Sequence, residues 1–313
     1  MRNVLRNLFI GLVLIVGLIV LSGCGTSNEV NEGEERKVLR VGMECAYAPY
    51  NWAQADDSNG AVPISGSSEY AYGYDVMMAK FLAEKMGYEL EIYQIDWDSL
   101  PVALQSNKID CVIAGQSITA ERLQTVDFTT PYYYASIVGL TMNDSKYANA
   151  EGVADLEGAT CTSQINTVWY DVCLPQIKNV NILPAMEVAS QMLVALDSGK
   201  TELVVTDMPT AMAATKVYPD MKILDFTNSE NDNFDVSEEE INIGISVRKG
   251  NSELLTNLNN ALAELTTADF ERMMGPALKE GSWQPENYTN YGNKYNEKLL
   301  IKDGAVAEDE KSK

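Results

Sequence analysis

Two closely similar stretches of the chain decide its fold: residues 102–115 read VALQSNKIDCVIAG, and residues 194–207 read VALDSGKTELVVTD. Each pattern predicts the end of a helix, a polar turn and a buried strand. Ligands of open α/β sheets bind beyond the carboxyl ends of the strands. Ser117, Thr119 and Arg122 follow the first copy, and Asp207 ends the second. The two halves of the chain therefore offer a cation and an anion, a pairing suited to a small zwitterion.

The segments around the first copy predict one α/β unit. Strands are expected at 38–43, 88–92 and 109–114, helices at 74–86 and 100–105, and a loop at 51–73. The apolar residues of the first helix have helical spacing, and Gly87 ends that helix. The alternation of strands and helices predicts a mostly parallel sheet with right-handed crossovers.

A second unit surrounds the second copy. Its strands are expected at 160–162, 181–183, 203–206 and 221–224, with helices between them. A strand at 241–247 and an amphipathic helix at 251–266 then return the chain to the first unit. The chain crosses between the units near 132–136 and 239–243, and such a double crossing is typical of a hinge.

The sequence of the amino terminus predicts an export signal. Arg2 and Arg6 precede an uncharged run at 8–21, which is short for a membrane span and typical of a signal peptide core. The ending Leu-Ser-Gly-Cys resembles the bacterial lipoprotein signal, in which Cys24 is lipidated. An uncleaved anchor or a soluble secreted form are the alternatives.

Composition excludes several classes of partner. The chain has 313 residues, 46% of them apolar, which is enough for two domains with a buried core each. From Cys24 onward it carries 21 basic and 45 acidic residues, and such a surface repels nucleic acid and anionic membranes. Because it has no histidine and no close cysteine pair, a transition-metal site is not expected. No cofactor is expected either. Cys161 and Cys173 either form a disulfide or stay as buried free thiols.

Several short motifs follow one another in a fixed order. They are LRVG at 39–42, YAPY at 47–50, GYDV at 73–76, ITAER at 118–122, VDF at 126–128, PYY at 131–133 and GISVRKG at 244–250. In this order and spacing the chain resembles the polar amino-acid receptors of bacterial ABC importers. The resemblance implies an α/β fold of the type II periplasmic-binding-protein kind. Its two lobes are each a mostly parallel sheet flanked by helices, and a two-strand hinge joins them.

The resemblance also implies domain bounds and a location. The expected segments are a signal peptide at 1–23, a tether at 24–37, lobe 1 at 38–133 and 244–290, lobe 2 at 134–243 and a polar tail at 291–313. Acylation of Cys24 is expected to anchor the protein on the extracellular face of the cytoplasmic membrane. There it is expected to work as a monomer with an ABC permease.

The resemblance assigns Arg122 to the ligand's α-carboxylate, which a guanidinium meets through two parallel hydrogen bonds. An ordinary surface ion pair with Glu121 is the alternative. Gly115 and Ser117 match positions whose backbone and hydroxyl also touch the ligand. Asp207 matches the residue that binds the α-ammonium, and its place just before a proline is also that of a helix N-cap.

Thr167 matches a threonine at a helix amino terminus that binds the same carboxylate. The family's usual Gly-Thr before it is replaced here by Ile165 and Asn166. Tyr47 and Trp97 match aromatic positions that sandwich the ligand side chain, and packing in the core is the alternative for both.

Glu44 stands where relatives place an acid near the ligand's ammonium or side chain, or else it is a solvated strand end. Tyr72, Gln116 and Trp169 are further candidates for the pocket wall. These residue types favour a polar or cationic ligand side chain. The sequence thus predicts a lipid-anchored receptor that captures a free amino acid by closing its lobes, without catalysis. The alternatives are an enzyme resembling cyclohexadienyl dehydratase, with Glu44 or Asp207 as general acid, and a ligand-sensing domain.

Overall fold

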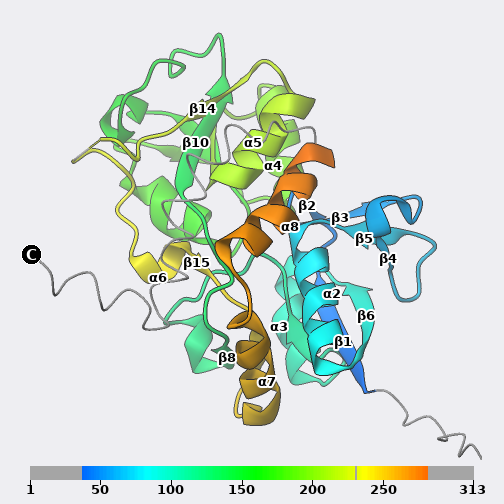
Figure 1. Ribbon diagram of the computed structural model, residues 1–313. Coiled ribbons are helices and arrows are strands. Elements are labelled where there is room, and N and C mark those ends of the chain that lie inside the picture. Colours follow the sequence, from blue (N-terminus) through cyan, green and yellow to red (C-terminus); the bar gives the residue numbers. More distant parts are fainter. Residues whose placement is uncertain (1–36, 230, 281–313) are drawn as a thin grey trace, which may run out of the picture. The chain divides into compact units, whose positions relative to one another are not determined.

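A computed structural model describes residues 37–229 and 231–280, and two five-stranded sheets form the framework of this part (Figure 1). The first sheet has the order β6 (Glu89–Gln94), β1 (Val38–Met43), β7 (Cys111–Val112), β16 (Ser246–Arg248), β8 (Val126–Phe128). The second has the order β12 (Asn181–Ile182), β11 (Thr160–Thr162), β13 (Leu203–Asp207), β10 (Ile137–Met142), β14 (Met221–Leu224). The predicted signal peptide, Cys24, the tether up to residue 36 and the polar tail lie outside the described residues.

Both sheets are mixed, whereas the sequence predicts mostly parallel ones. Strand β1 runs parallel to β6 and β7, but β16 runs antiparallel to β7 and β8. Strand β11 likewise runs parallel to β12 and β13, and β10 runs antiparallel to β13 and β14. The physical reason is that β10 and β16 each follow a chain crossing. No strand–helix–strand connection precedes them to fix a parallel direction.

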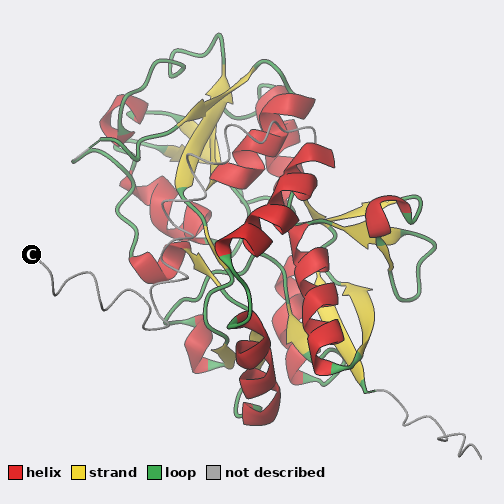
Figure 2. Ribbon diagram, in the orientation of Figure 1, coloured by secondary structure: helices red, strands yellow, loops and turns green. Residues whose placement is uncertain are grey.

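Helices cover the sheets (Figure 2). Helix α2 (Tyr74–Met86) has the predicted bounds, and Gly87 ends it in the left-handed conformation at φ 69°. Helix α3 (Leu100–Gln105) also has its predicted bounds and packs beside β1, β7 and β16. Helices α4 (Ala189–Asp197) and α5 (Met208–Val217) pack against strands of the second sheet.

The last two helices differ from the prediction of one helix at 251–266. Helix α7 (Ser252–Leu262) ends earlier, and α8 (Thr267–Glu280) follows it. The physical reason is a new start signal: the backbone N–H and hydroxyl of Thr266 both donate to the Asp269 carboxylate, at 3.0 and 2.7 Å. Such a contact caps the start of α8 instead of continuing α7.

Two short strands join the halves of the fold. Strands β9 (Tyr133–Tyr134) and β15 (Asn242–Ile243) pair antiparallel, where the sequence predicts the two crossings. The single strand predicted at 241–247 is divided into β15 and β16 at Gly244. A side chain at that position would meet Ile118 at 2.7 Å and Phe128 at 3.1 Å, so close packing requires glycine.

Three short strands interrupt the loop predicted at 51–73 and form a small antiparallel sheet with β2 (Ala46–Tyr47). Its order is β2, β3 (Asn51–Gln54), β5 (Tyr70–Tyr72), β4 (Val62–Pro63). The rings of Trp52 and Tyr72 pack edge to face across β3 and β5, with centroids 5.1 Å apart. The buried Asn51 amide donates to Asp75 at 2.7 Å. These contacts between distant residues order a segment whose composition reads as a loop.

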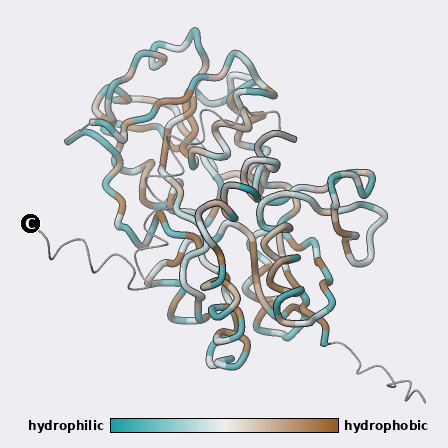
Figure 3. Tube along the Cα trace, in the orientation of Figure 1, coloured by the Kyte–Doolittle hydropathy of each residue, from teal (hydrophilic) through white to brown (hydrophobic). Residues whose placement is uncertain are grey.

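The interior is apolar, with brown strands inside and mainly teal loops outside (Figure 3). Cys161 and Cys173 are unpaired, and both are fully buried at 0% exposure. Burial raises the pKa of the Cys161 thiol to about 12, so it stays protonated. In residues 37–229 and 231–280, no helix combines the length and the apolar character needed to cross a membrane.

Candidate functional site

Side chains from both sheets meet around a small cavity of about 20 Å³, here called the inner cavity. It is lined by Glu44, Tyr47, Trp97, Ala114, Gly115, Ser117, Arg122, Gln164, Thr167, Val168 and Trp169. Seven of the eight predicted site residues are thus brought together, and Asp207 is the exception. The volume suffices for about one or two waters, so an amino acid requires these walls to move apart.

Arg122 lies after β7 of the first sheet, and its side chain contacts a loop that follows β11 of the second sheet. The residue begins a 3₁₀ turn, Arg122–Gln124. Its Nη1 donates to the Ser117 carbonyl and its Nη2 to the Asn166 carbonyl, both at 2.8 Å. The guanidinium lies 5.4 Å from the centre of the Trp97 ring. Burial lowers the pKa of Arg122 to about 10, which leaves it cationic at neutral pH with further N–H donors for a carboxylate.

Glu44 lies just beyond the end of β1 and is only 4% exposed. Its Oε2 accepts from Gln164 Nε2 at 3.0 Å, whereas its buried Oε1 has no hydrogen-bond partner among the described residues. Burial raises the pKa of Glu44 to about 7, and Gln164 and the Ala189 backbone partly oppose this rise. A carboxylate held this way is stabilised by a cation placed beside its free oxygen.

Asp207 lies behind Tyr47 and does not line the inner cavity. Its Oδ1 accepts from the Thr210 backbone N–H at 2.9 Å, so it is the N-cap of α5. The Tyr47 hydroxyl donates to its other oxygen. Burial raises the pKa of Asp207 to about 6. The capping alternative is thereby confirmed, and a contact with the ligand's ammonium stays a prediction.

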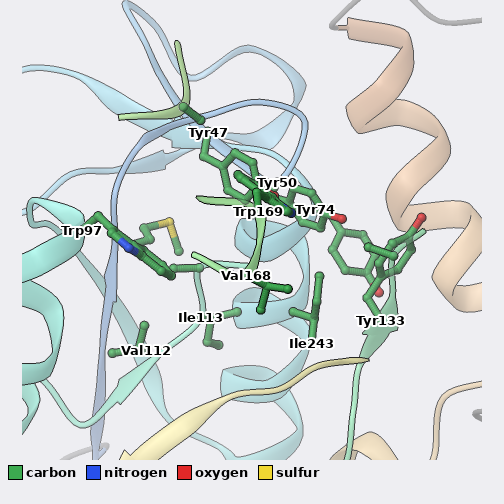
Figure 4. Close-up of a cluster of buried hydrophobic side chains, with 14 of the residues drawn as sticks. Tyr47, Tyr50, Tyr74, Trp97, Val112, Ile113, Tyr133, Val168, Trp169 and Ile243 are labelled. Carbon is green, nitrogen blue, oxygen red and sulfur yellow. The ribbon is translucent and has the colours of Figure 1, made fainter. Parts of the chain in front are cut away.

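Three aromatic residues, Tyr47, Trp97 and Trp169, line the inner cavity and belong to the cluster of buried side chains in Figure 4. Tyr47 stacks on Tyr50 with centroids 4.7 Å apart, and Trp169 tilts against Tyr47 at 6.0 Å. In Figure 4 Trp97 lies apart from this group, at the left of the view. The packing alternative therefore holds for Tyr47 in part, because one of its faces is covered.

Two of the smaller predicted residues also shape the loops of the site. Gly115 has φ 61°, and a side chain there would collide with the Tyr47 ring, so glycine is required on both counts. The Thr167 hydroxyl donates to the Gln164 carbonyl at 2.7 Å and accepts from the Tyr170 N–H at 3.3 Å. It thereby caps the π-helical turn Trp169–Cys173.

Ile165 and Asn166, which replace the family's usual Gly-Thr, have a structural role that the sequence alone did not reveal. Asn166 has φ 56°, a left-handed conformation that asparagine tolerates better than most residues. Its side-chain Nδ2 donates to Asp98 Oδ1 at 2.8 Å, and its carbonyl accepts from Arg122. The neighbouring Gln164, which was not predicted, bonds Glu44. The sequence feature that pointed to Asn166 and Gln164 was the replacement of the usual Gly-Thr just before Thr167.

A larger groove, here called the outer groove, adjoins the inner cavity and has a volume of about 620 Å³. Its lining includes the carboxylates Asp98, Glu121, Asp171 and Glu240, together with Gln116. Of the three weaker candidates, Trp169 lines the inner cavity and Gln116 the outer groove, whereas Tyr72 lines neither. Within the described residues, no three Cys, Asp or Glu side chains are grouped to hold a metal ion.

The chain is similar in sequence and in structure to known amino-acid-binding proteins. The arginine-binding extracellular protein ArtP of Bacillus subtilis is 32% identical over 159 residues, which cover 50% of this chain and 56% of ArtP. The L-cystine-binding protein TcyJ of Escherichia coli K12 is 26% identical, over 80% of this chain and 88% of TcyJ. The structure of an ancestral arginine-binding protein bound to arginine is similar with a TM-score of 0.63 and 30% identity. That match covers 78% of this chain and 99% of that one.

A family model also matches most of the chain. It describes bacterial extracellular solute-binding proteins of family 3 and matches residues 39–273, which include every residue of the inner cavity. This chain belongs to the bacterial extracellular solute-binding proteins, family 3.

Proposed function

We propose that the protein binds a free amino acid with a cationic side chain between its two sheets and delivers it to an ABC import permease. The observation that carries the proposal is the pair of opposite charges at one cavity. Arg122 offers N–H donors to a carboxylate, and the buried Glu44 offers an unpartnered oxygen to a cation. Both ends of an arginine-like ligand find a matching charge.

The free oxygen of Glu44 favours a cationic ligand over a merely polar one. A neutral amide or hydroxyl donates one hydrogen bond but leaves the buried charge uncompensated, at a cost of several kcal/mol. A guanidinium or ammonium compensates both the charge and the oxygen. ArtP and the ancestral protein, whose names record arginine binding, support this choice.

Ligand capture then requires movement of the two sheets about β9 and β15. The two sheets with their helices are taken as lobes bounded near residues 133/134 and 243/244. The contacts Arg122–Asn166, Gln164–Glu44 and Tyr47–Asp207 join them. Arg122 and Glu44 both belong to lobe 1, so we propose that the ligand favours the closed arrangement through its added contacts with lobe 2, whose Gln164 and Thr167 line the same cavity. The ligand's α-ammonium would reach Asp207 if the Tyr47 hydroxyl releases it.

Outside the described residues, Cys24 and the signal at 1–23 support a lipid-anchored receptor on the extracellular face of the membrane. The protein is proposed to work there as a monomer and without catalysis. The rival dehydratase reading requires a positioned general acid, and Asp207, one of its two candidates, is held as a helix cap behind Tyr47.

Isothermal titration of the purified protein with each of the twenty amino acids and with ornithine tests the proposal. Arginine, lysine or ornithine should bind at micromolar affinity or better, with neutral amino acids at least about tenfold weaker because Glu44 stays uncompensated. The Glu44→Gln variant should lose this preference, and Glu89→Gln, an exposed control on β6, should keep it. Tight binding of an apolar amino acid, unchanged in Glu44→Gln, would overturn it.

A further inference from the structure

The outer groove is continuous in its walls with the inner cavity. The two share Trp97, Arg122, Thr167 and Val168 as lining residues. The outer groove, at about 620 Å³, has room for a whole amino acid, whereas the inner cavity of about 20 Å³ does not. A ligand approaching Arg122 through the groove meets its walls before it reaches Glu44.

Carboxylates from four separate segments line this groove. Asp98 and Glu121 belong to the first-sheet side, and Asp171 and Glu240 to the second-sheet side. Partial desolvation and the nearby charge of Glu121 raise the pKa of Asp171, and Arg122 partly opposes this rise, so the two carboxylates that line the groove repel one another. A cation between them relieves this repulsion.

Among the described residues that line the groove, Arg122 is the one basic side chain, and its single positive charge does not balance four carboxylates. Its Nη1 and Nη2 already donate to main-chain carbonyls, and its guanidinium lies over Trp97. The structure therefore provides the groove with more negative than positive charge.

A second observation is independent of these acids. Gln116 lines the same groove and is only 6% exposed, and its side-chain Oε1 has no hydrogen-bond partner among the described residues. A buried acceptor without a donor is costly, which makes it a place where a ligand N–H gains a hydrogen bond. The carboxylates and the Gln116 amide oxygen are therefore complementary to the same kind of group, a cation with several N–H donors.

We propose that the outer groove is an outer docking position for the cationic amino acid on its way to the inner cavity. The proposal rests on the proposed function and adds a second site to it. The ligand's cationic group lies among Glu121, Asp171 and Glu240, and Gln116 accepts one of its N–H groups. The ligand then passes Trp97 and Arg122 into the inner cavity.

Such a position acts on the rate of association more than on the final complex. Clefts lined by one sign of charge raise the local concentration of an oppositely charged ligand, and the effect weakens with salt. Once the ligand is in the inner cavity, its dissociation depends mainly on Arg122 and Glu44. The association rate therefore reports on the outer groove, and the dissociation rate reports on the inner cavity.

The test compares two triple variants that each remove three negative charges. One is Glu121→Gln/Asp171→Asn/Glu240→Gln, in which Gln at 240 still suits the N3 position of the capping box that Ser237 forms at the start of α6 (Glu238–Ile241). The control is Glu84→Gln/Glu89→Gln/Asp197→Asn, at exposed residues outside the groove. Stopped-flow fluorescence of Trp97 and Trp169 with L-arginine gives association and dissociation rates at low and high salt.

In the groove variant the association rate constant should fall about fivefold at low salt, and its dependence on salt should flatten. The dissociation rate should stay within about twofold. Both rates of the control should match the wild type. An equal fall in both variants, or no fall in the groove variant, overturns the outer docking position and leaves arginine binding intact.

Other outcomes are equally decisive. If the wild type binds no cationic amino acid, the proposed function fails and the outer position fails with it. If the triple variant does not fold, Asp171→Asn alone, at an exposed residue, should slow association about twofold at low salt, and an unchanged rate would reject the proposal.

Discussion

The two similar stretches of the chain build the same scaffold in the two sheets. In each, a helix ends in a turn with one left-handed residue, Asn107 at φ 65° and Gly199 at φ 71°. Each turn then leads into a strand. Strand β7 runs parallel to its neighbour β1, and β13 runs parallel to its neighbour β11. Asparagine and glycine are the residues that adopt this conformation most readily.

The acids that precede the two strands also play one role. Asp110 accepts from the Arg40 backbone N–H at 3.0 Å, and Glu202 accepts from the Thr160 backbone N–H at 2.9 Å. Each acid thereby fastens its turn to the neighbouring strand, β1 or β11. The correspondence extends to hydrogen bonds that sequence similarity alone does not reveal.

The two stretches differ where the strands end. The first ends at Gly115, which turns back and leads to Ser117 and Arg122 in the inner cavity. The second ends at Asp207, which starts α5 at once and has both carboxylate oxygens bonded within the protein. A shared scaffold therefore carries a site residue on one side and a helix cap on the other. Function resides in the few residues after the strand.

The largest expected effect concerns the cation after the first stretch. Arg122→Ala should weaken arginine binding about a thousandfold, because it leaves the ligand carboxylate buried and unpaired. Arg122→Lys should restore little, since an ammonium cannot form two parallel hydrogen bonds. Calorimetry checks both, with Arg272→Ala on α8 as an exposed control. Affinity unchanged in Arg122→Ala would contradict the claim that the residue after the first stretch binds the ligand.

The next effect concerns the acid that ends the second stretch. Asn is also a good N-cap, so Asp207→Asn should keep the melting temperature, whereas Asp207→Ala should cost about 1 kcal/mol or more. If Asp207 also binds the α-ammonium, Asp207→Asn should lose affinity about fiftyfold despite its normal stability. Thermal unfolding and calorimetry on both variants separate the roles. Full affinity in Asp207→Asn would leave it a cap alone.

A smaller effect depends on pH. The pKa of Glu44 is about 7 in the folded protein against an ordinary 4.5, and only the ionised form attracts a cation. Affinity for arginine should therefore rise about tenfold from pH 6 to pH 8, and Glu44→Gln should abolish the rise. Titrations in buffers of different ionisation enthalpy should show proton release near pH 6.5.

Stability should show the opposite trend for the same group. Since the folded pKa is the higher one, the folded state holds a proton that the unfolded state has lost between pH 4.5 and 7. The contribution of Glu44 to the free energy of unfolding is greatest below pH 4.5 and falls by up to about 3 kcal/mol as pH rises through 7. A wild type no more pH-sensitive in urea unfolding than Glu44→Gln would contradict this account.

The smallest effect concerns Asn166. Asn166→Gly keeps the left-handed backbone but removes the bond to Asp98, so arginine affinity should fall about threefold without loss of stability. In a double-mutant cycle with Asp98→Ala, the second change should cost little once the first is made. Fully additive losses would show that the two side chains do not act together.

Much of this architecture was predictable because it is local. Helical spacing and Gly87 predict the bounds of α2 that the structure shows. The order of the motifs predicts that Glu44, Trp97 and Arg122 belong to one site, and all three line the inner cavity. The small sheet of β2, β3, β4 and β5 was not predictable, since packing between distant residues such as Trp52 and Tyr72 orders it. Of the two partners of Asp207, the Thr210 N–H follows from the predicted N-cap position, whereas the Tyr47 hydroxyl depends on a tertiary contact.

Three related ligands test the central claim, that Arg122 and Glu44 hold opposite ends of one molecule. Agmatine is arginine without its carboxylate, and citrulline has a neutral urea group in place of the guanidinium. Titrating all three should show that Arg122→Ala binds arginine no better than agmatine, whereas Glu44→Gln binds arginine no better than citrulline. The account is contradicted if either variant keeps the full wild-type preference for arginine over its matched analogue.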